Sequence, residues 1–259
     1  MVRILVTNDD GIDAPGLLEL ARAVYSAGHE VIVAAPLKEA SGSSCSLTSV
    51  QEDGRTVIER RSWSELGDVE VMSVVASPAF ISLLALRRAF GDPPELVVSG
   101  INEGPNTGRA VIHSGTVGAA LTAATYGARG LAVSMELGER CHWETARRLV
   151  TTVLPRLADA PRGTTLNLNV PNRPLSEVPG LRSARLAPFG TVQTQVADSG
   201  EGFVKIAYTE PTEQAPPDSD AALLREGFAT ITELQPISEV AGPADRELAT
   251  SGAPFDRVT

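Results

Sequence analysis

The sequence has little cysteine and few aromatic residues. Cys45 and Cys141 are its only cysteines, which excludes a disulfide framework and a thiolate metal cluster. No apolar run approaches the roughly 20 residues needed to span a bilayer. A strand pattern begins within three residues of the N-terminus, so we expect no signal peptide and a cytoplasmic location.

Several common catalytic motifs are missing as well. The sequence has no G-x-G-x-x-G, no H-E-x-x-H, no serine nucleophile elbow and no Walker lysine. Its formal net charge is -10, which argues against binding to polymeric nucleic acid or to an anionic membrane. An acidic protein that handles an anionic substrate needs a local positive centre, and a bound cation provides one.

Strand-like apolar runs alternate with helix-like periodic segments through the first two thirds of the sequence. The expected strands cover residues 3–8, 29–36, 56–60, 69–75, 96–100, 130–135 and 165–171. The expected helices cover residues 16–27, 78–90, 114–127 and 143–157. This alternation predicts an α/β fold, with a mostly parallel sheet and helices on both of its faces.

The last third of the sequence has a different character. Residues 180–234 contain a β-like piece at 202–210 and a short helix followed by a strand within 218–234. We therefore expect an α/β catalytic core at 1–179, a β-rich extension at 180–234 and a polar, mobile tail at 235–259.

Two adjacent acids follow the first expected strand. Asp9 and Asp10 interrupt the apolar run in ILVTNDDGIDAPG, where an open α/β sheet binds its ligands. Neighbouring carboxylates repel each other, and a hard divalent cation with oxygen ligands relieves that repulsion. The alternative is that Asp10 and Asp13 cap the following helix.

The second candidate loop is rich in serine and follows the second strand. Ser41, Gly42 and Ser43 lie in LKEASGSSCSLT, where a hydroxyl such as that of Ser41 can complete a metal shell and nearby N–H groups can face a phosphate. A flexible polar turn is the alternative.

The third candidate loop begins after the strand at 96–100. Asn102 and Asn106 offer neutral carbonyl oxygens, and Gly100, Gly104 and Gly108 allow the backbone to approach a ligand. All three loops follow strands of one parallel sheet, so we expect them at one edge of that sheet.

A helix start closes this third loop. Ser114 is a natural N-cap, after which Gly115 and Thr116 present unpaired N–H groups. Such a helix terminus is a ready anion site, although a simply capped helix is the alternative.

Taken in order, six segments resemble the SurE family of survival proteins, which are metal-dependent 5′/3′-nucleotidases. The segments are NDDGIDAPG, ASGSSCSLT, ELVVSGINEGPN, HSGTVGAAL, LNLNVP and DSDAALLREGFATITEL. The resemblance runs from residue 1 to about 234. It implies a Rossmann-like core, and a C-terminal extension that forms homodimers or homotetramers by exchange.

The resemblance also implies roles for particular residues. The family's metal ligands fall on Asp9, Asp10, Ser41 and Asn102, which would hold one Mg²⁺ or Mn²⁺. Its phosphate-side residues fall on Asn106 and on the turn at 114–116.

We assign catalysis to Asp9, Asp10, Asn106 and Ser114. Substrate binding is assigned to Asn8, Gly42, Ser43, Asn106, Ser114, Gly115 and Thr116. The expected reaction is hydrolysis of nucleoside 5′- and 3′-monophosphates by in-line attack of a metal-activated water.

Two positions depart from the family pattern. Ala40 stands where relatives commonly carry Arg or Gln, which bears on contacts to the substrate phosphate. Phe80 replaces an acidic residue in a TPADC-like segment, which bears on structure or substrate selection more than on the metal.

Three other functions compete with this prediction. A hydrolase of another phosphate ester or of short polyphosphate shares the same chemistry. A phospho-accepting receiver module needs a suitably placed lysine, but Lys38 and Lys205 are the only lysines. A dinucleotide-binding oxidoreductase would place its pyrophosphate against the acids of the first loop, where charge repulsion opposes it.

Overall fold

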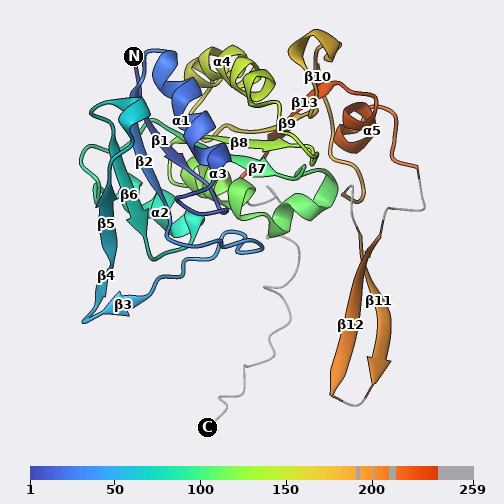
Figure 1. Cartoon of the computed structure of the whole chain (residues 1–259), viewed down its shortest axis with the longest axis horizontal. Helices are drawn as coiled ribbons and strands as arrows, with labels where there is room; N and C mark the ends of the chain where they lie inside the picture. The colour runs from blue at the N-terminus through green and yellow to red at the C-terminus, as the bar shows by residue number, and fades with distance from the viewer. Residues whose placement is uncertain (191–192, 201, 210–213, 239–259) are drawn as a thin grey trace, which may run out of the picture.

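Nine strands among the described residues form one sheet in the middle of the molecule (Figure 1). The computed structural model describes residues 1–190, 193–200, 202–209 and 214–238. In spatial order the strands are β10 (Leu181–Ser183), β13 (Ala229–Leu234), β9 (Thr165–Val170), β8 (Arg129–Met135), β7 (Leu96–Glu103), β1 (Arg3–Thr7), β2 (Glu30–Pro36), β6 (Glu70–Val74) and β5 (Ile58–Arg61).

The centre of this sheet is parallel, as the alternating pattern predicted. The strands from β9 through β8, β7, β1 and β2 to β6 all run in one direction, while β5 and β13 pair antiparallel at the two sides. Ile4, Leu5 and Val6 of β1 have no exposed surface, because helices cover both faces of the sheet.

The strand order reverses beside β1. The polypeptide passes from β1 to β2 and β6 on one side, then returns to place β7, β8 and β9 on the other. Loops leaving the carboxyl ends of β1 and β7 diverge at such a switch point and leave a crevice that binds ligands.

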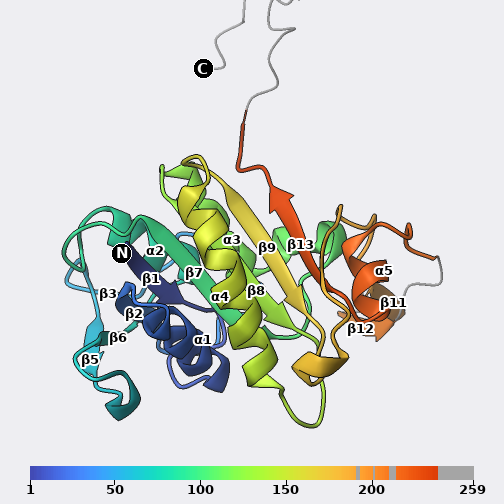
Figure 2. The same cartoon turned by 90° about the horizontal axis from the view of Figure 1, so that it is seen from above.

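Two pairs of helices cover the sheet (Figures 1 and 2). On one face, α1 (Pro15–Ser26) packs against α4 (Trp143–Asp159), and their apolar residues join one core cluster. On the other face, α2 (Pro78–Leu86) packs against α3 (Gly115–Thr125). The α/β fold with helices on both faces is therefore confirmed.

Most elements end within two residues of the prediction, and α2 and β7 differ the most. Helix α2 stops at Leu86 instead of residue 90, because Arg88 adopts φ 66°, outside the helical region. Strand β7 continues past residue 100 to Glu103, after an irregularity in its pairing with β8 between Ser99 and Asn102.

The predicted β-rich extension is divided between two places. Strands β11 (Gln193–Gly200) and β12 (Phe203–Thr209) form an antiparallel hairpin that projects from the body (Figure 1). Helix α5 (Asp220–Arg225) precedes β13, which returns to the main sheet beside β9. Most of the tail expected to be mobile, residues 239–259, lies outside the described residues.

Short elements complete the fold. They are the strands β3 (Gln51–Glu52) and β4 (Arg55–Thr56) and the 3₁₀ helices η1 (Ser64–Leu66), η2 (Gly108–His113) and η3 (Leu175–Glu177). Within the described residues, no helix has the length and apolar character needed to cross a membrane.

Candidate active site

The acid pair lies at the carboxyl end of β1, beside the switch point. Asp9 is only 3% exposed. Its backbone carbonyl oxygen accepts a hydrogen bond of 2.7 Å from the N–H of Ala40, and its carboxylate Oδ1 accepts one from the hydroxyl of Thr116. The serine-rich loop and the start of α3 therefore both contact the first loop.

The third loop reaches the same place through Asn102. Its Nδ2 donates to the C=O of Gly104 at 2.6 Å, which fixes the orientation of the amide. Its Oδ1 lies 3.5 Å from Oγ1 of Thr116, the hydroxyl that also donates to Asp9. One hydroxyl thus joins a carboxylate oxygen and an amide oxygen, two of the donors predicted for a hard metal.

The acid pair does not cap α1. The N-cap residue of that helix is Ala14, and no side chain makes a capping hydrogen bond there. The alternative interpretation of Asp10 and Asp13 as helix caps is therefore wrong, and the burial of the acids needs another explanation.

The pKa values of both acids are displaced by their surroundings. Burial raises the pKa of Asp9, although hydrogen bonds from the Thr116 side chain and from the backbone N–H groups of Thr116 and Gly115 oppose that shift. Burial also raises the pKa of Asp10, to about 7, with a further increase from the negative charge of Asp9.

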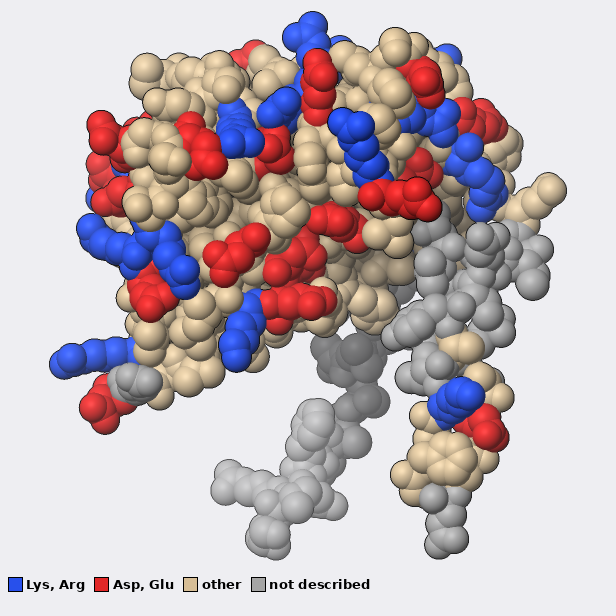
Figure 3. Space-filling view, in the orientation of Figure 1, with Lys and Arg blue, Asp and Glu red and all other residues tan. Residues whose placement is uncertain are grey.

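Two further acids add to this negative field. Glu103 and Glu39 both raise the pKa of Asp10 through their charge. Figure 3 shows Asp and Glu side chains gathered across the middle of the face it displays. Within the described residues, neither Asp9 nor Asp10 forms an ion pair with a basic side chain. Two adjacent acids, one buried and one half-buried, without such a partner fit a divalent cation.

Ser43 supplies an unpaired hydroxyl at the same spot. Its Oγ is buried and has no hydrogen-bond partner among the described residues. A Cβ added to Gly115 would lie 2.6 Å from this Oγ and 2.8 Å from Asp9 Oδ2, so only glycine lets both oxygens approach the start of α3 this closely. An orphaned hydroxyl beside a carboxylate fits a metal ion or a phosphate oxygen.

Ser41 is placed differently. It is exposed, and its Oγ donates to Oε1 of Glu39 at 2.8 Å. The neighbouring Gly42 adopts φ 75°, a left-handed conformation that turns the loop at this point. The hydroxyl of Ser43 lies beside Gly115, as the carboxylate of Asp9 does.

The donor set is rich in neutral oxygen. Within the described residues, no three His, Cys, Asp or Glu side chains lie close enough together to hold a metal. A site here would combine the two aspartates with hydroxyl, amide and water oxygens, which suits a magnesium-like ion better than a thiolate- or imidazole-binding metal.

The start of α3 has the predicted N-cap. Ser114 adopts an extended backbone conformation, and its Oγ accepts a hydrogen bond of 3.2 Å from the N–H of Val117. The N–H groups of Gly115 and Thr116 point at the carboxylate of Asp9. The positive end of the helix dipole therefore faces the acid pair.

Asn8 and Asn106 each belong to a local hydrogen-bond network. Asn8 is fully buried, donates to the C=O of Gly11 at 2.9 Å and accepts from its N–H at 3.3 Å. Because both the Oδ1 and the Nδ2 of its side chain bind within the turn, this geometry favours a positioning role over direct contact with a substrate. Asn106 donates from Nδ2 to Oγ of Ser134 at 2.8 Å.

Sequence reasoning missed the partners of Asn106. Asn167 and Asn169 of β9 both hydrogen bond to its backbone. The signal was visible, because LNLN places two asparagines at alternate positions of a buried strand, where polar side chains are rare.

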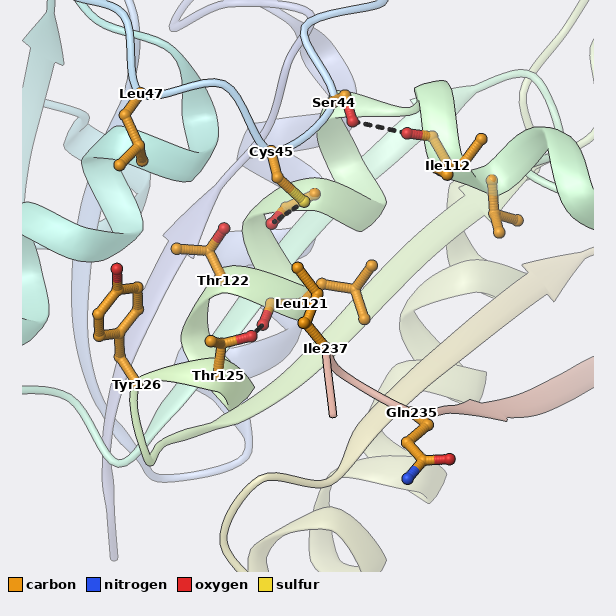
Figure 4. Close-up of a pocket in the computed structure, with 12 residues that line it drawn as sticks. Ser44, Cys45, Leu47, Ile112, Leu121, Thr122, Thr125, Tyr126, Gln235 and Ile237 are labelled. Carbon is orange, nitrogen blue, oxygen red and sulfur yellow. Dashed lines mark hydrogen bonds between the residues drawn. The ribbon is translucent and has the colours of Figure 1, made fainter. Parts of the chain in front are cut away.

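An apolar cavity lies beside the site, on another stretch of α3 (Figure 4). Its volume is about 480 Å³, and Ser44, Cys45, Gly118, Leu121 and Tyr126 are among its lining residues. A Cβ on Gly118 would meet the C=O oxygen of Ser44 at 2.0 Å, so the serine-rich loop presses directly on the helix here. None of the predicted site residues lines this cavity.

Comparison with known proteins gives a consistent result. The family model described as "Survival protein SurE" matches residues 4–191. A protein of Cronobacter sakazakii named "5′/3′-nucleotidase SurE" is 40% identical over 239 residues, which is 90% of this chain and 90% of that protein. A protein of Yersinia pseudotuberculosis with the same name is 37% identical over 240 residues, 91% of this chain and 90% of its own.

The fold agrees with a solved structure. The crystal structure of the SurE protein from Aquifex aeolicus superposes with a TM-score of 0.77, at 27% sequence identity, and covers 92% of this chain and 94% of its own. With the family match and the 40% identity across nine tenths of both proteins, the conclusion is direct: this chain belongs to the SurE family.

Proposed function

We propose that this chain is a metal-dependent phosphomonoesterase that hydrolyses nucleoside 5′- and 3′-monophosphates to nucleoside and phosphate. The names of its relatives support this activity. The observation that carries the proposal is the acid pair, with Asp9 buried and Asp10 half-buried. No basic side chain among the described residues pairs with either acid, and the orphaned hydroxyl of Ser43 lies near Asp9 at the start of α3.

One Mg²⁺ or Mn²⁺ is the proposed cofactor. Asp9, Asp10, Ser41 and Asn102 would hold it. Because the Ser43 hydroxyl and the Asp9 carboxylate both lie beside Gly115, that second hydroxyl is available to the ion or to a phosphate oxygen. Bound there, a divalent ion supplies positive charge for the phosphate and lowers the pKa of a water molecule.

Asp9 is the proposed general base. As the water oxygen attacks phosphorus, the water gives one proton to a carboxylate oxygen of Asp9 and the phosphorus–ester oxygen bond breaks. The departing oxygen takes up a proton from solvent and leaves as the nucleoside hydroxyl, and Asp9 then returns its proton to solvent. The hydroxyl of Thr116 donates to Oδ1 of Asp9 and so holds the carboxylate in one orientation.

Asn106, Ser114, Gly115 and Thr116 are proposed to face the phosphoryl oxygens, with Gly42 and Ser43 opposite. Ser114 orients the first turn of α3 through its bond to Val117, so its contribution lies in presenting the helix terminus. Donors fixed before the reaction stabilise charge that develops in the transition state. Asn8 would act through the shape of the turn that follows the acids.

The test is phosphate release by chelator-stripped protein, with single metals added back. The substrate panel contains 5′- and 3′-nucleotides, a non-nucleotide phosphomonoester and short polyphosphate. We expect turnover of nucleotides with Mg²⁺ or Mn²⁺ and none without metal. If polyphosphate or the non-nucleotide ester is hydrolysed faster than nucleotides, the protein is a hydrolase of that substrate and not a nucleotidase. Stable labelling by acetyl phosphate would favour the receiver-like module.

We further propose a cytoplasmic homodimer or homotetramer that binds neither nucleic acid polymers nor membranes. Residues 180–234 would mediate assembly around a catalytic core at 1–179, since the β11–β12 hairpin projects away from the body (Figure 1). Light scattering on the whole protein and on a variant lacking residues 193–209 tests this. Unchanged mass in the variant would contradict the role of the hairpin.

A further inference from the structure

Asn169 binds both backbone polar groups of Asn106. Its Oδ1 accepts a hydrogen bond of 2.9 Å from the N–H of Asn106, and its Nδ2 donates one of 2.9 Å to the C=O of the same residue. A single side-chain amide therefore fixes one residue of the third loop at two points, although 63 positions separate them.

Asn167 adds a third bond to the same residue. Its Nδ2 donates to the C=O of Asn106 at 2.8 Å. Asn167 and Asn169 are two positions apart on β9 and share one face of the strand, and neither has exposed surface. The Oδ1 of Asn167 has no hydrogen-bond partner among the described residues. An unsatisfied buried polar atom weakens the fold, so stability alone does not account for asparagine here.

The strand that carries these asparagines is held on both sides. β8 pairs with β9 in parallel register and β13 pairs with it antiparallel, with Thr230 opposite Asn169 and Thr232 opposite Asn167. Strand β9 is therefore a firm support for the third loop.

The third loop is fastened again two residues further on. The N–H of Gly108 donates to Oδ2 of Asp220 at 2.8 Å, and Oδ1 of that buried acid accepts from the N–H of Ala187 at 2.9 Å. A Cβ on Gly108 would lie 2.1 Å from the C=O oxygen of Phe189. The backbone at Asn106 and beyond it is thus fixed without any ligand.

We propose that Asn167 and Asn169 are positioning residues for the reaction, which act by holding the backbone of Asn106 and so aiming its side chain at the phosphoryl group. This inference rests on the proposed function. Because Asn106 is assigned to charge that develops in the transition state, misplacing it lowers kcat more than it raises KM.

The central variant is Asn169→Asp, which keeps the shape and the acceptor but replaces the donor Nδ2 by an oxygen that faces the C=O of Asn106. Losing such a supporting bond lowers activity by about 10–100-fold in comparable sites. We expect kcat to fall by about 30-fold, with KM for a nucleotide and the metal concentration for half-maximal activity each changed less than about threefold.

Asn172→Asp is the matched control. Asn172 also accepts from a backbone N–H, that of His142 at 2.9 Å, and donates to a backbone C=O, that of Arg140 at 3.0 Å, but it holds a different loop. A kcat for Asn169→Asp no lower than that of the control, or a rise in KM with kcat intact, overturns the proposal.

A double-mutant cycle with Asn106→Ala separates positioning from general damage to the fold. If Asn169 acts through Asn106, Asn169→Asp lowers kcat by less than about threefold once the Asn106 side chain is gone. The full 30-fold loss in that background would contradict the proposal.

Amide hydrogen exchange gives a readout that needs no activity. In Asn169→Ala the N–H of Asn106 loses its acceptor and should exchange at least about tenfold faster, while the N–H of Gly108 stays protected by Asp220. Unchanged protection of Asn106 would show that Asn169 does not hold its backbone. Phosphate release from the nucleotide panel by the wild-type protein tests the proposed function independently of these variants.

Discussion

The two halves of the candidate site are built on opposite plans. The acid half, around Asp9 and Asp10, buries negative charge and leaves the hydroxyl of Ser43 without a partner among the described residues. In the amide half, around Asn106, side chains of β8 and β9 already bind the backbone and the side-chain amide. The acid half has polar groups left for a bound cation or phosphate, whereas the polar groups of the amide half bind one another.

The difference predicts separable effects of mutation. Changes in the acid half should abolish activity while leaving the metal-free fold unharmed, because they relieve repulsion. Changes in the amide half should misplace the side chain of Asn106 relative to the phosphoryl group. Proteins commonly trade stability for function in this way at their sites.

The largest expected effect is that of Asp9→Asn. Losing a ligand and the proposed base together should lower phosphate release by about a thousandfold or more, since loss of a single transition-state donor already costs about 10²–10³. The control is Asp13→Asn in the same turn, where the side chain is exposed. If the Asp9 variant hydrolyses nucleotides nearly as fast as the wild type, the acid half has no role in catalysis.

Gly115→Ala should come next. The added methyl group would lie 2.6 Å from Ser43 Oγ and 2.8 Å from Asp9 Oδ2, too close for a carbon atom, so the two side chains must move. We expect about a hundredfold loss of turnover and a lower Tm, because the clash outweighs the better helix propensity of alanine. Thr125→Ala, at the exposed end of α3, serves as the control. Full activity with alanine at 115 would show that the placement of Ser43 and Asp9 beside Gly115 is not needed for turnover.

Ser41→Ala distinguishes the two hydroxyls of the serine-rich loop. If Ser41 is a ligand, the metal concentration for half-maximal activity should rise by about tenfold. The matched control is Ser64→Ala, since Ser64 is also exposed and donates to a glutamate carboxylate, at 3.1 Å. An unchanged metal requirement would transfer the assignment to Ser43, whose hydroxyl lies beside Gly115, as the Asp9 carboxylate does.

The smallest predicted effect concerns pH and stability. The pKa of Asp10 is raised from 3.8 to about 7, so the folded protein keeps a proton that the unfolded protein releases, and stability falls as pH rises between those values. Asp10→Asn should remove this loss and melt several degrees higher than wild type at pH 8 in chelator, with no such gain at pH 4. The same difference in Tm between the variant and the wild type at pH 4 and at pH 8 would contradict this prediction.

Much of the fold follows from local patterns in the sequence. Continuous apolar runs located β1 and β7, and the capping role of Ser114 was readable from its position. The end of α2 was not, because it depends on the left-handed backbone of Arg88, a position that no glycine or proline marks.

The site was less predictable than the fold. NDDG indicates where the acids lie, but the choice between Ser41 and Ser43 depends on how one loop turns at Gly42. The clamp on Asn106 joins residues from β9 and from the loop after β7, and only the pairing register brings them into contact. LNLN marks the two asparagines in the sequence, but no local pattern identifies Asn106 as their partner.

The position of β13 at the far side of β9 has a consequence for biosynthesis. A ribosome delivers the acids of the first loop early, whereas the strand that flanks Asn167 and Asn169 emerges only with residues 229–234. Domains generally fold as units. The sheet that carries both halves of the site is therefore completed only after β13 has been synthesised, and catalytic competence would arrive among the last events of maturation.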